Sequence, residues 1–344
     1  MSDRTDPPLQ PRVALFDDGD TAPDLPVCDH YCGIELRMRK ALALQAEMGP
    51  VFDITLDCED GAPIGAEAEH ATMVAELALS ADNRYGRVGA RVHPWGHPAF
   101  AADVETLVGR AGDRLAYLMV PKPRHLADLQ QAIAHIGQVA RAHGRGLALP
   151  VHALVETHGA LRDVQALAAL PQVQSLSFGL MDFVSAHRGA IPQSGMSARG
   201  QFEHPLVVRA KLEIAAACHA EAKVPSHCVV TEFKDTAALF AAASRAAREF
   251  GYTRMWSIHP AQIRPIVEAF APTVAELDQA IEIVRAAQAA QWAPIRFRDT
   301  LHDRASFRYF WQVIERAHRT SFAGGPQLPA ELQAAWFGAV PTAV

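Results

Sequence analysis

Residues 147–183 contain two short apolar runs, and each of them leads to a carboxylate side chain. The run at 150–155 is followed by Glu156, and the run at 173–178 leads to Asp182. Between the two runs, apolar residues recur at the spacing of one face of a short helix. Strand, helix and strand of these lengths form a parallel crossover unit. We therefore expect Glu156 and Asp182 to lie at the same edge of a sheet, on neighbouring strands, where both are accessible to solvent.

Two acidic side chains at the edge of a parallel sheet suit a hard divalent cation. Carboxylate oxygens are ligands that Mg²⁺ prefers, and water or substrate oxygens complete its coordination. Because acidic residues are common at strand ends, an alternative stays open: Glu156 and Asp182 are then unrelated loop carboxylates or N-caps of helices.

Strand-like apolar runs recur along the rest of the chain, with helical segments between most of them. The expected strands lie at 13–16, 51–60, 87–94, 114–122, 147–157, 173–182, 226–235 and 254–260. Eight strands that alternate with helices predict an α/β protein with the TIM (β/α)8 barrel fold, and an open doubly wound sheet is the alternative.

Nearly every expected strand ends in a charged or imidazole side chain. These residues are Glu59, Asp60, Arg91, His93, Lys122, Glu156, Asp182, Lys234, Asp235 and His259. In a barrel, the carboxyl ends of all strands meet at one mouth, where active sites of this fold lie. In an open sheet the same side chains would spread along a long edge, so they favour the barrel.

The pattern changes near the C-terminal part of the chain. We expect a barrel with an N-terminal extension over residues 1–270 and a C-terminal helical segment over 271–344. Thr273 and Glu276 have the spacing of a capping box at the start of its first helix. The aromatic cluster of Phe307, Tyr309, Phe310 and Trp311 is expected to pack in the second helix. Such a segment commonly forms a lid over a barrel mouth or a contact between subunits.

Composition excludes several classes of protein. The net charge is −6 and the pI is about 6.2, which argues against a nucleic-acid or anionic-membrane surface. No apolar run approaches the length of roughly 18 residues that a membrane-spanning helix needs, and the polar N-terminus does not resemble a secretory signal. We therefore expect a cytoplasmic protein. Its five cysteines are odd in number and scattered, which indicates free thiols rather than a disulfide framework.

The polar strand ends resemble those of the HpcH/HpaI aldolase and citrate lyase β-subunit superfamily, in its malyl-CoA-lyase-like branch. The matching segments follow the family order from about residue 38 to 290. They are LDCEDGA with Asp57, Glu59 and Asp60, GARVHP with Arg91, VPKP with Lys122, LVETHGAL with Glu156, FGLMDF with Asp182, and SIHPAQI with His259. His93 stands where the family has Asn. The C-terminal match, TLHDRASFRYF with Asp303, is loose.

The resemblance implies a Mg²⁺-dependent carbon–carbon lyase. Its expected substrate is a 3-hydroxyacyl-CoA thioester of the citryl-CoA or malyl-CoA type, which yields a 2-oxo acid and an acyl-CoA. Glu156 and Asp182 would bind the metal, with Glu156 also contacting the substrate. Arg91 would stabilise the developing negative charge, and Asp303 would protonate the enolate from a lid.

The resemblance also suggests supporting roles and partners. Lys122 would contact substrate, whereas Asp57, Glu59, Asp60 and His259 would hold the waters of the metal or orient Arg91. The expected partners are a small 2-oxo or hydroxy acid, a CoA thioester and further copies of the chain, as a trimer or hexamer.

Alternatives remain open for the residues and for the function. Arg91 could be an ion-pair partner of Glu59 or Asp60, Lys122 could simply neutralise the acidic mouth, and His259 could be a structural residue. A class II aldolase that acts on free 2-keto acids such as pyruvate is the second functional hypothesis. A non-catalytic subunit of a lyase complex is the third.

Overall fold

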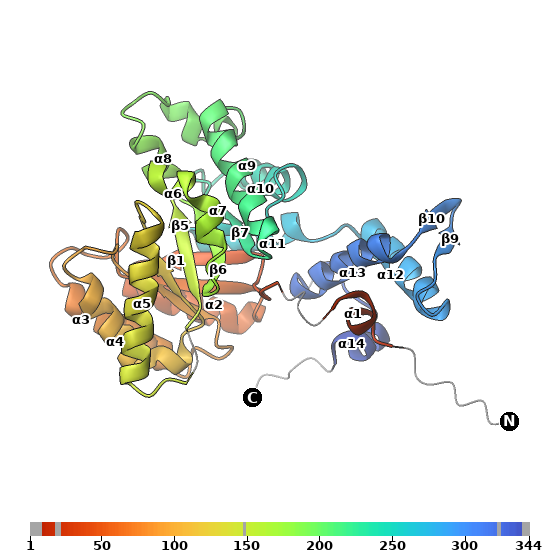
Figure 1. The fold of residues 1–344 in the computed structure, drawn as a ribbon, viewed down its shortest axis with the longest axis horizontal. Helices are drawn as coiled ribbons and strands as arrows, with labels where there is room; N and C mark the ends of the chain where they lie inside the picture. Colours follow the sequence, from red (N-terminus) through yellow and green to blue (C-terminus); the bar gives the residue numbers. More distant parts are fainter. Residues whose placement is uncertain (1–8, 18–21, 147–148, 322–324, 339–344) are drawn as a thin grey trace. The chain divides into compact units, whose positions relative to one another are not determined.

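The computed structural model describes residues 9–17, 22–146, 149–321 and 325–338, and it divides into two compact units (Figure 1). One unit spans Ala22–Ala269. The other combines Met1–Thr21 with Phe270–Val344.

The larger unit is a closed parallel barrel, which confirms the predicted fold class. Within the part that the structure describes, eight strands pair in sequence order and β1 closes against β8. The strands are β1 (Cys28–Cys32), β2 (Phe52–Asp57), β3 (Val88–Arg91), β4 (Leu118–Val120), β5 (Val151–Val155), β6 (Val173–Phe178), β7 (Val224–His227) and β8 (Arg254–Ser257). Most strand residues are buried, since helices cover the outside and side chains fill the inside.

Helices follow the strands and surround the barrel (Figure 1). They are α2 (Glu35–Met48), α3 (Glu67–Leu79), α4 (Phe100–Ala111), α5 (Leu126–Ala142), α6 (His158–Arg162), α7 (Val164–Ala168), α8 (Leu180–Ser185), α9 (Pro205–Ala220), α10 (Thr236–Glu249) and α11 (Pro260–Phe270). The single helix that was expected after Glu156 is thus divided into α6 and α7, which meet at Asp163.

The predicted first strand is wrong. Residues 13–16 belong mostly to a helix, α1 (Pro11–Leu15), whose Leu15 is buried in the core of the smaller unit. The first barrel strand is β1, in a segment where no strand was expected. The sequence CDHYC lacks an apolar run because Asp29 points its carboxylate toward Arg254, 3.3 Å away inside the barrel. An ion pair in the barrel interior therefore hid this strand from a search for apolar runs.

Each of the other expected strands extends beyond the observed strand at one end or at both. The strand expected at 226–235 is shorter, because β7 ends at His227 and Asp235 is instead the N-cap of α10, where it accepts a hydrogen bond from the Ala238 amide. The strand expected at 147–157 is observed as β5, and residues 147 and 148 lie outside the described residues.

The smaller unit is mainly helical. It contains α1, α12 (Val274–Ala289), a hairpin of β9 (Ile295–Phe297) and β10 (Thr300–His302), α13 (Arg304–Arg319) and α14 (Ala330–Phe337). The predicted capping box of Thr273 and Glu276 is confirmed at the start of α12. Phe307 and Trp311 are buried as expected, whereas Tyr309 is exposed. Tyr309 faces solvent because it lies outside the apolar face of α13, whose buried residues recur at helical spacing.

The cysteines and the apolar character of the helices can also be compared with the sequence-based expectations. All five cysteines are buried free thiols, as predicted. No helix in the described ranges is both long and apolar enough to cross a membrane.

Candidate active site

A buried arginine lies at the carboxyl end of β3. Arg91 Nε is 2.6 Å from Asp57 Oδ1, and Nη2 is 2.9 Å from Asp57 Oδ2, so the guanidinium binds the carboxylate with two hydrogen bonds. The Tyr31 hydroxyl from β1 contacts both groups, and its ring stacks on Trp256 of β8. Burial acts to raise the pKa of Asp57, but the hydrogen bonds and charge of Arg91 hold that pKa below its ordinary value.

The sequence did not identify this cluster completely. It allowed a pairing of Arg91 with Glu59 or Asp60, and Arg91 Nη2 does lie 3.2 Å from Glu59 Oε2. Asp57 is the closer partner, and Tyr31 was missed because no strand was expected at its position. No pattern around Tyr31 would have identified it, since its role depends on closure of β1 against β8.

Lys122 joins the carboxylates that follow β2. Its Nζ lies 2.6 Å from both Glu59 Oε1 and Asp60 Oδ2, and 3.8 Å from Asp182 Oδ1. Its backbone has a φ of 52°, in the left-handed region, which turns the chain directly after β4. The structure thus brings four of the predicted site residues within one group of charges.

Glu156 directly follows β5 and is buried, so the prediction that it is accessible to solvent is wrong. Only 3% of Glu156 is exposed, because neighbouring strand ends and the start of α8 enclose it. Its Oε1 accepts a hydrogen bond of 2.9 Å from the Lys122 amide. Burial, together with the negative charge of Asp182, raises the pKa of Glu156 to about 8. The Asp182 side chain is 46% exposed, in agreement with the prediction.

Gly179 makes room for the Glu156 carboxylate. It lies between β6 and α8, and a Cβ added there would come within 2.2 Å of Glu156 Oε2 and 2.5 Å of its Cβ. Any side chain at this position would therefore displace Glu156 or α8. Gly179, directly after β6, thus has a packing role that places Glu156 next to the helix bearing Asp182.

His259 is separate from this group of charges. It is exposed, follows β8, and stacks on Phe233 with ring centroids 5.0 Å apart. Both rings line a cavity of about 590 Å³ that also reaches Tyr31, Arg37 and Lys40. Basic side chains thus lie on the β1 side of the barrel mouth, opposite in strand order to Glu156.

Asp303 lies in the smaller unit, where it begins α13. Its Oδ1 accepts hydrogen bonds from the amides of Ala305 at 3.1 Å and Ser306 at 3.3 Å, and the Ser306 hydroxyl completes a capping box. A capping aspartate stabilises the start of a helix. This structural role accounts for the residue by itself, and its predicted role as a proton donor stays a prediction.

The two carboxylates at the barrel mouth, Glu156 and Asp182, suit a cation that takes few of its ligands from protein. Across the described residues, no group of three His, Cys, Asp or Glu side chains is arranged to hold a metal ion. Glu156 and Asp182 are two carboxylates whose mutual repulsion contributes to the raised pKa of Glu156, and a bound cation would relieve that repulsion. Mg²⁺ commonly binds through one or two carboxylates and takes its other ligands from water or substrate.

The chain resembles known proteins over most of its length. A family model described as HpcH/HpaI aldolase/citrate lyase matches residues 39–260. L-malyl-CoA/beta-methylmalyl-CoA lyase of Cereibacter sphaeroides is 28% identical over 285 residues, which cover 78% of this chain and 88% of that protein.

Solved structures are also similar. A citrate lyase from Burkholderia xenovorans LB400 is 55% identical, with a TM-score of 0.81 over 96% of this chain and 99% of that chain. The CitE protein of Mycobacterium tuberculosis, in complex with magnesium, acetoacetate and coenzyme A, is 21% identical. Its TM-score is 0.66 over 86% of this chain and 99% of that chain, a likeness of fold alone.

Proposed function

The chain belongs to the HpcH/HpaI aldolase/citrate lyase family and is a carbon–carbon lyase, and from this premise we propose its substrate and its metal. The proposed reaction is the Mg²⁺-dependent cleavage, or formation, of a 3-hydroxyacyl-CoA thioester of the citryl-CoA or malyl-CoA type. Its products are a 2-oxo acid and an acyl-CoA.

One observation carries the proposal: two carboxylates of unequal burial lie beside a buried arginine at the mouth of a closed barrel. Glu156 is enclosed and its pKa is raised, while Asp182 is half-exposed. Arg91 is fixed by two hydrogen bonds to Asp57. Glu156 and Asp182 can supply metal ligands. The guanidinium of Arg91 supplies a positive charge whose orientation is fixed before the substrate binds.

Mg²⁺ would be held by Glu156 and Asp182. Bound there, it would act as a Lewis acid toward the carboxylate and carbonyl oxygens of a 2-oxo acid. Arg91 would bind the oxygen on which negative charge develops. Its Nη1 takes no part in the bonds to Asp57, Glu59 and Tyr31, so this nitrogen is the donor assigned to substrate. Glu59 would hold both Arg91 and Lys122 in place through its two carboxylate oxygens.

The cavity near His259 supports a substrate with a long anionic arm. It contains Arg37 and Lys40 and reaches Tyr31, which contacts Arg91. Phosphate groups of a CoA thioester would find basic partners there, while the acyl end would reach Arg91. A free 2-keto acid would leave this cavity without a ligand.

Asp303 is proposed as the proton donor to the thioester enolate, from a lid supplied by a neighbouring chain of a trimer or hexamer. For this role the carboxyl group would have to carry a proton and give up its hydrogen bonds to the α13 amides. Asp303→Asn preserves the cap and removes the acid. We expect this variant to bind a CoA thioester normally and to turn it over slowly, measured as release of the acyl-CoA product.

The test of the function compares substrates directly. Purified protein is incubated with malyl-CoA, citryl-CoA or free 4-hydroxy-2-keto acids, in Mg²⁺ or in EDTA, and 2-oxo acid release is followed. We expect cleavage of a CoA thioester that requires Mg²⁺. Cleavage restricted to the free acids would favour the class II aldolase, and no cleavage of any of these compounds would favour the non-catalytic subunit.

A further inference from the structure

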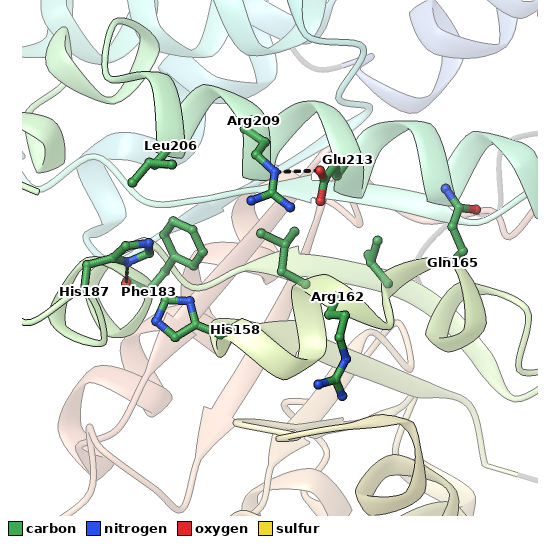
Figure 2. Close-up of a pocket in the computed structure, with 10 residues that line it drawn as sticks. His158, Arg162, Gln165, Phe183, His187, Leu206, Arg209 and Glu213 are labelled. Atoms are coloured by element: carbon green, nitrogen blue, oxygen red, sulfur yellow. Dashed lines mark hydrogen bonds and ion pairs between the residues drawn. The ribbon is translucent and has the colours of Figure 1, made fainter. Parts of the chain in front are cut away.

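A second cavity lies in the helical layer of the barrel unit. It measures about 500 Å³ and is lined by residues of α6, α7, α8 and α9 together with His187 (Figure 2). The lining residues fall within 158–213 and do not include Arg91, Glu156 or Asp182. Small-molecule sites commonly have volumes of roughly 300–1,000 Å³. The cavity, which we call the α8–α9 pocket, is therefore large enough for a ligand of its own.

Two histidines at this pocket have defined tautomers. His187 Nδ1 lies 2.6 Å from the Phe183 carbonyl oxygen, and His158 Nε2 lies 3.2 Å from the Ala186 carbonyl oxygen. A carbonyl only accepts hydrogen bonds, so each of these nitrogens carries the proton. In the neutral rings, His187 Nε2 and His158 Nδ1 are then acceptors. The ring centroids are 4.5 Å apart, which concentrates both acceptors at one end of the pocket.

A cation lies across the pocket from the histidines. In Figure 2, the Arg209 side chain points from α9 toward the residues of α6 and α8. Its Nε donates to Glu213 Oε1 at 2.8 Å, and among the residues that the structure describes neither terminal nitrogen of the guanidinium has a hydrogen-bond partner. Arg162 differs, since its side chain points away from the other residues and pairs with Asp163.

The remaining wall of the pocket is apolar. Leu206 is 38% exposed on the first turn of α9, although it is a large apolar side chain. Phe183 lies beside the two imidazoles, with its centroid 4.6 Å from that of His187 and 6.2 Å from that of His158. A flat ring between Leu206 and the imidazole faces would cover apolar surface that is now accessible to water.

We propose that the α8–α9 pocket binds a small hydroxylated aromatic carboxylate. Arg209 binds the carboxylate with its two terminal nitrogens, which match carboxylate geometry. His158 and His187 accept hydrogen bonds from the hydroxyl group, and Leu206 packs on the ring. Because α8 carries both Asp182 and the Phe183 that supports the imidazoles, the ligand is placed to act as an effector of the barrel site. The binding itself does not depend on the proposed lyase reaction.

The experiment measures binding of three probes to the full-length protein by isothermal titration calorimetry in EDTA. The probes are 4-hydroxybenzoate, benzoate and phenol, which separate the contributions of carboxylate and hydroxyl. EDTA removes divalent metal, so that no probe binds through a cation at the barrel mouth. We expect saturable binding of 4-hydroxybenzoate, binding about tenfold weaker for benzoate, and no saturation by phenol.

Two arginine variants form a matched pair. Arg209→Gln should weaken 4-hydroxybenzoate binding by about tenfold or more, while Arg162→Gln should leave it unchanged. Both arginines are largely exposed, and thermal unfolding checks that both variants fold. His187→Phe keeps the ring and removes the acceptor, so it should bring the affinity for 4-hydroxybenzoate down to that for benzoate.

Several results would overturn the proposal. Equal affinity of wild type and Arg209→Gln, or equal losses in the Arg209 and Arg162 variants, would show that Arg209 does not bind the carboxylate. Absence of saturable binding of all three probes up to about 10 mM would show that the pocket does not take this class of ligand.

Discussion

Arg91 depends on the geometry of its guanidinium. Asp57 binds it through Nε and Nη2, and Tyr31 and Glu59 contact the same Nη2. A lysine ammonium has no planar fork, so it cannot reproduce the paired bonds to Asp57 and still donate to substrate. The side chain is also almost fully buried, which limits rearrangement around a substitute.

We predict that Arg91→Lys raises the activation barrier by about 2–4 kcal/mol, because an oriented donor to the developing charge is lost. The measurement is kcat/KM for the thioester that wild type cleaves. Arg124→Lys is the control, since Arg124 is exposed and pairs with Asp128. Near wild-type turnover by Arg91→Lys would mean that Arg91 only closes an ion-pair network.

Lys211 makes stability depend on pH. It is buried in α9, where Nζ donates to Gln201 Oε1 at 2.8 Å and lies 3.7 Å from the centroid of Phe202. Burial lowers its pKa from 10.5 to about 8. Between these values the unfolded chain binds more protons than the folded one, so the free energy of unfolding rises with pH. Below pH 8 both states are protonated and the full cost of burying the charge is present.

We predict that Lys211→Met removes this pH dependence and stabilises the protein at pH 7. The difference in the free energy of unfolding between wild type and variant should change by about 3 kcal/mol between pH 8 and 10.5. Denaturant unfolding at several pH values measures it, with the exposed Lys234→Met as control. If the difference in the free energy of unfolding between wild type and Lys211→Met stayed constant over this pH range, the lowered pKa of Lys211 would be contradicted.

Most of the site could be predicted from the residues at the strand ends, because the carboxyl ends of all strands in a parallel barrel lie at one mouth. Lys122, Glu156 and Asp182 were expected together and are found together. The element that escaped prediction is β1. Its Asp29 lies inside the barrel near Arg254, an arrangement that long-range pairing with β8 creates and no local pattern reveals. Tyr31 was missed with it.

The turn between β6 and α8 places Glu156 and Asp182 beside each other. A Cβ at Gly179 would come within 2.2 Å of Glu156 Oε2, so Gly179→Ala must displace the carboxylate or α8. We predict an affinity for Mg²⁺ that is lower by about 10–100-fold. Gly146→Ala is the control, since an added Cβ there meets no atom within 4 Å. Calorimetric titration with Mg²⁺ measures both variants, and equal affinities would contradict the role given to this turn.

At the scale of the whole molecule, the chain divides into a barrel unit and a mainly helical unit. The division between the units falls between Ala269 and Phe270, and α1 groups with the C-terminal elements rather than with the barrel. The sequence could not indicate this, because burial of Leu15 among α12 and α13 residues depends on contacts between the two ends of the chain.

We predict that the protein is a trimer or hexamer, since a lid that supplies Asp303 to a neighbouring chain requires several copies. Light scattering after size-exclusion chromatography should give three or six times 37.3 kDa. A monomeric mass that persists under the conditions of turnover would exclude donation of Asp303 from another chain.

Binding of Mg²⁺ by Glu156 and Asp182 is the step on which the proposed function depends. Glu156→Gln and Asp182→Asn keep the size of each side chain and replace a carboxyl group, which can ionise and bind a cation, with a neutral amide. Glu105→Gln, on the exposed side of α4, makes the same change elsewhere. The decisive measurement is calorimetric titration of the four proteins with Mg²⁺ in the presence of a 2-oxo acid. We predict one site in wild type and Glu105→Gln and no detectable site in the other two variants. Unaltered Mg²⁺ affinity in Glu156→Gln and Asp182→Asn would contradict the proposal.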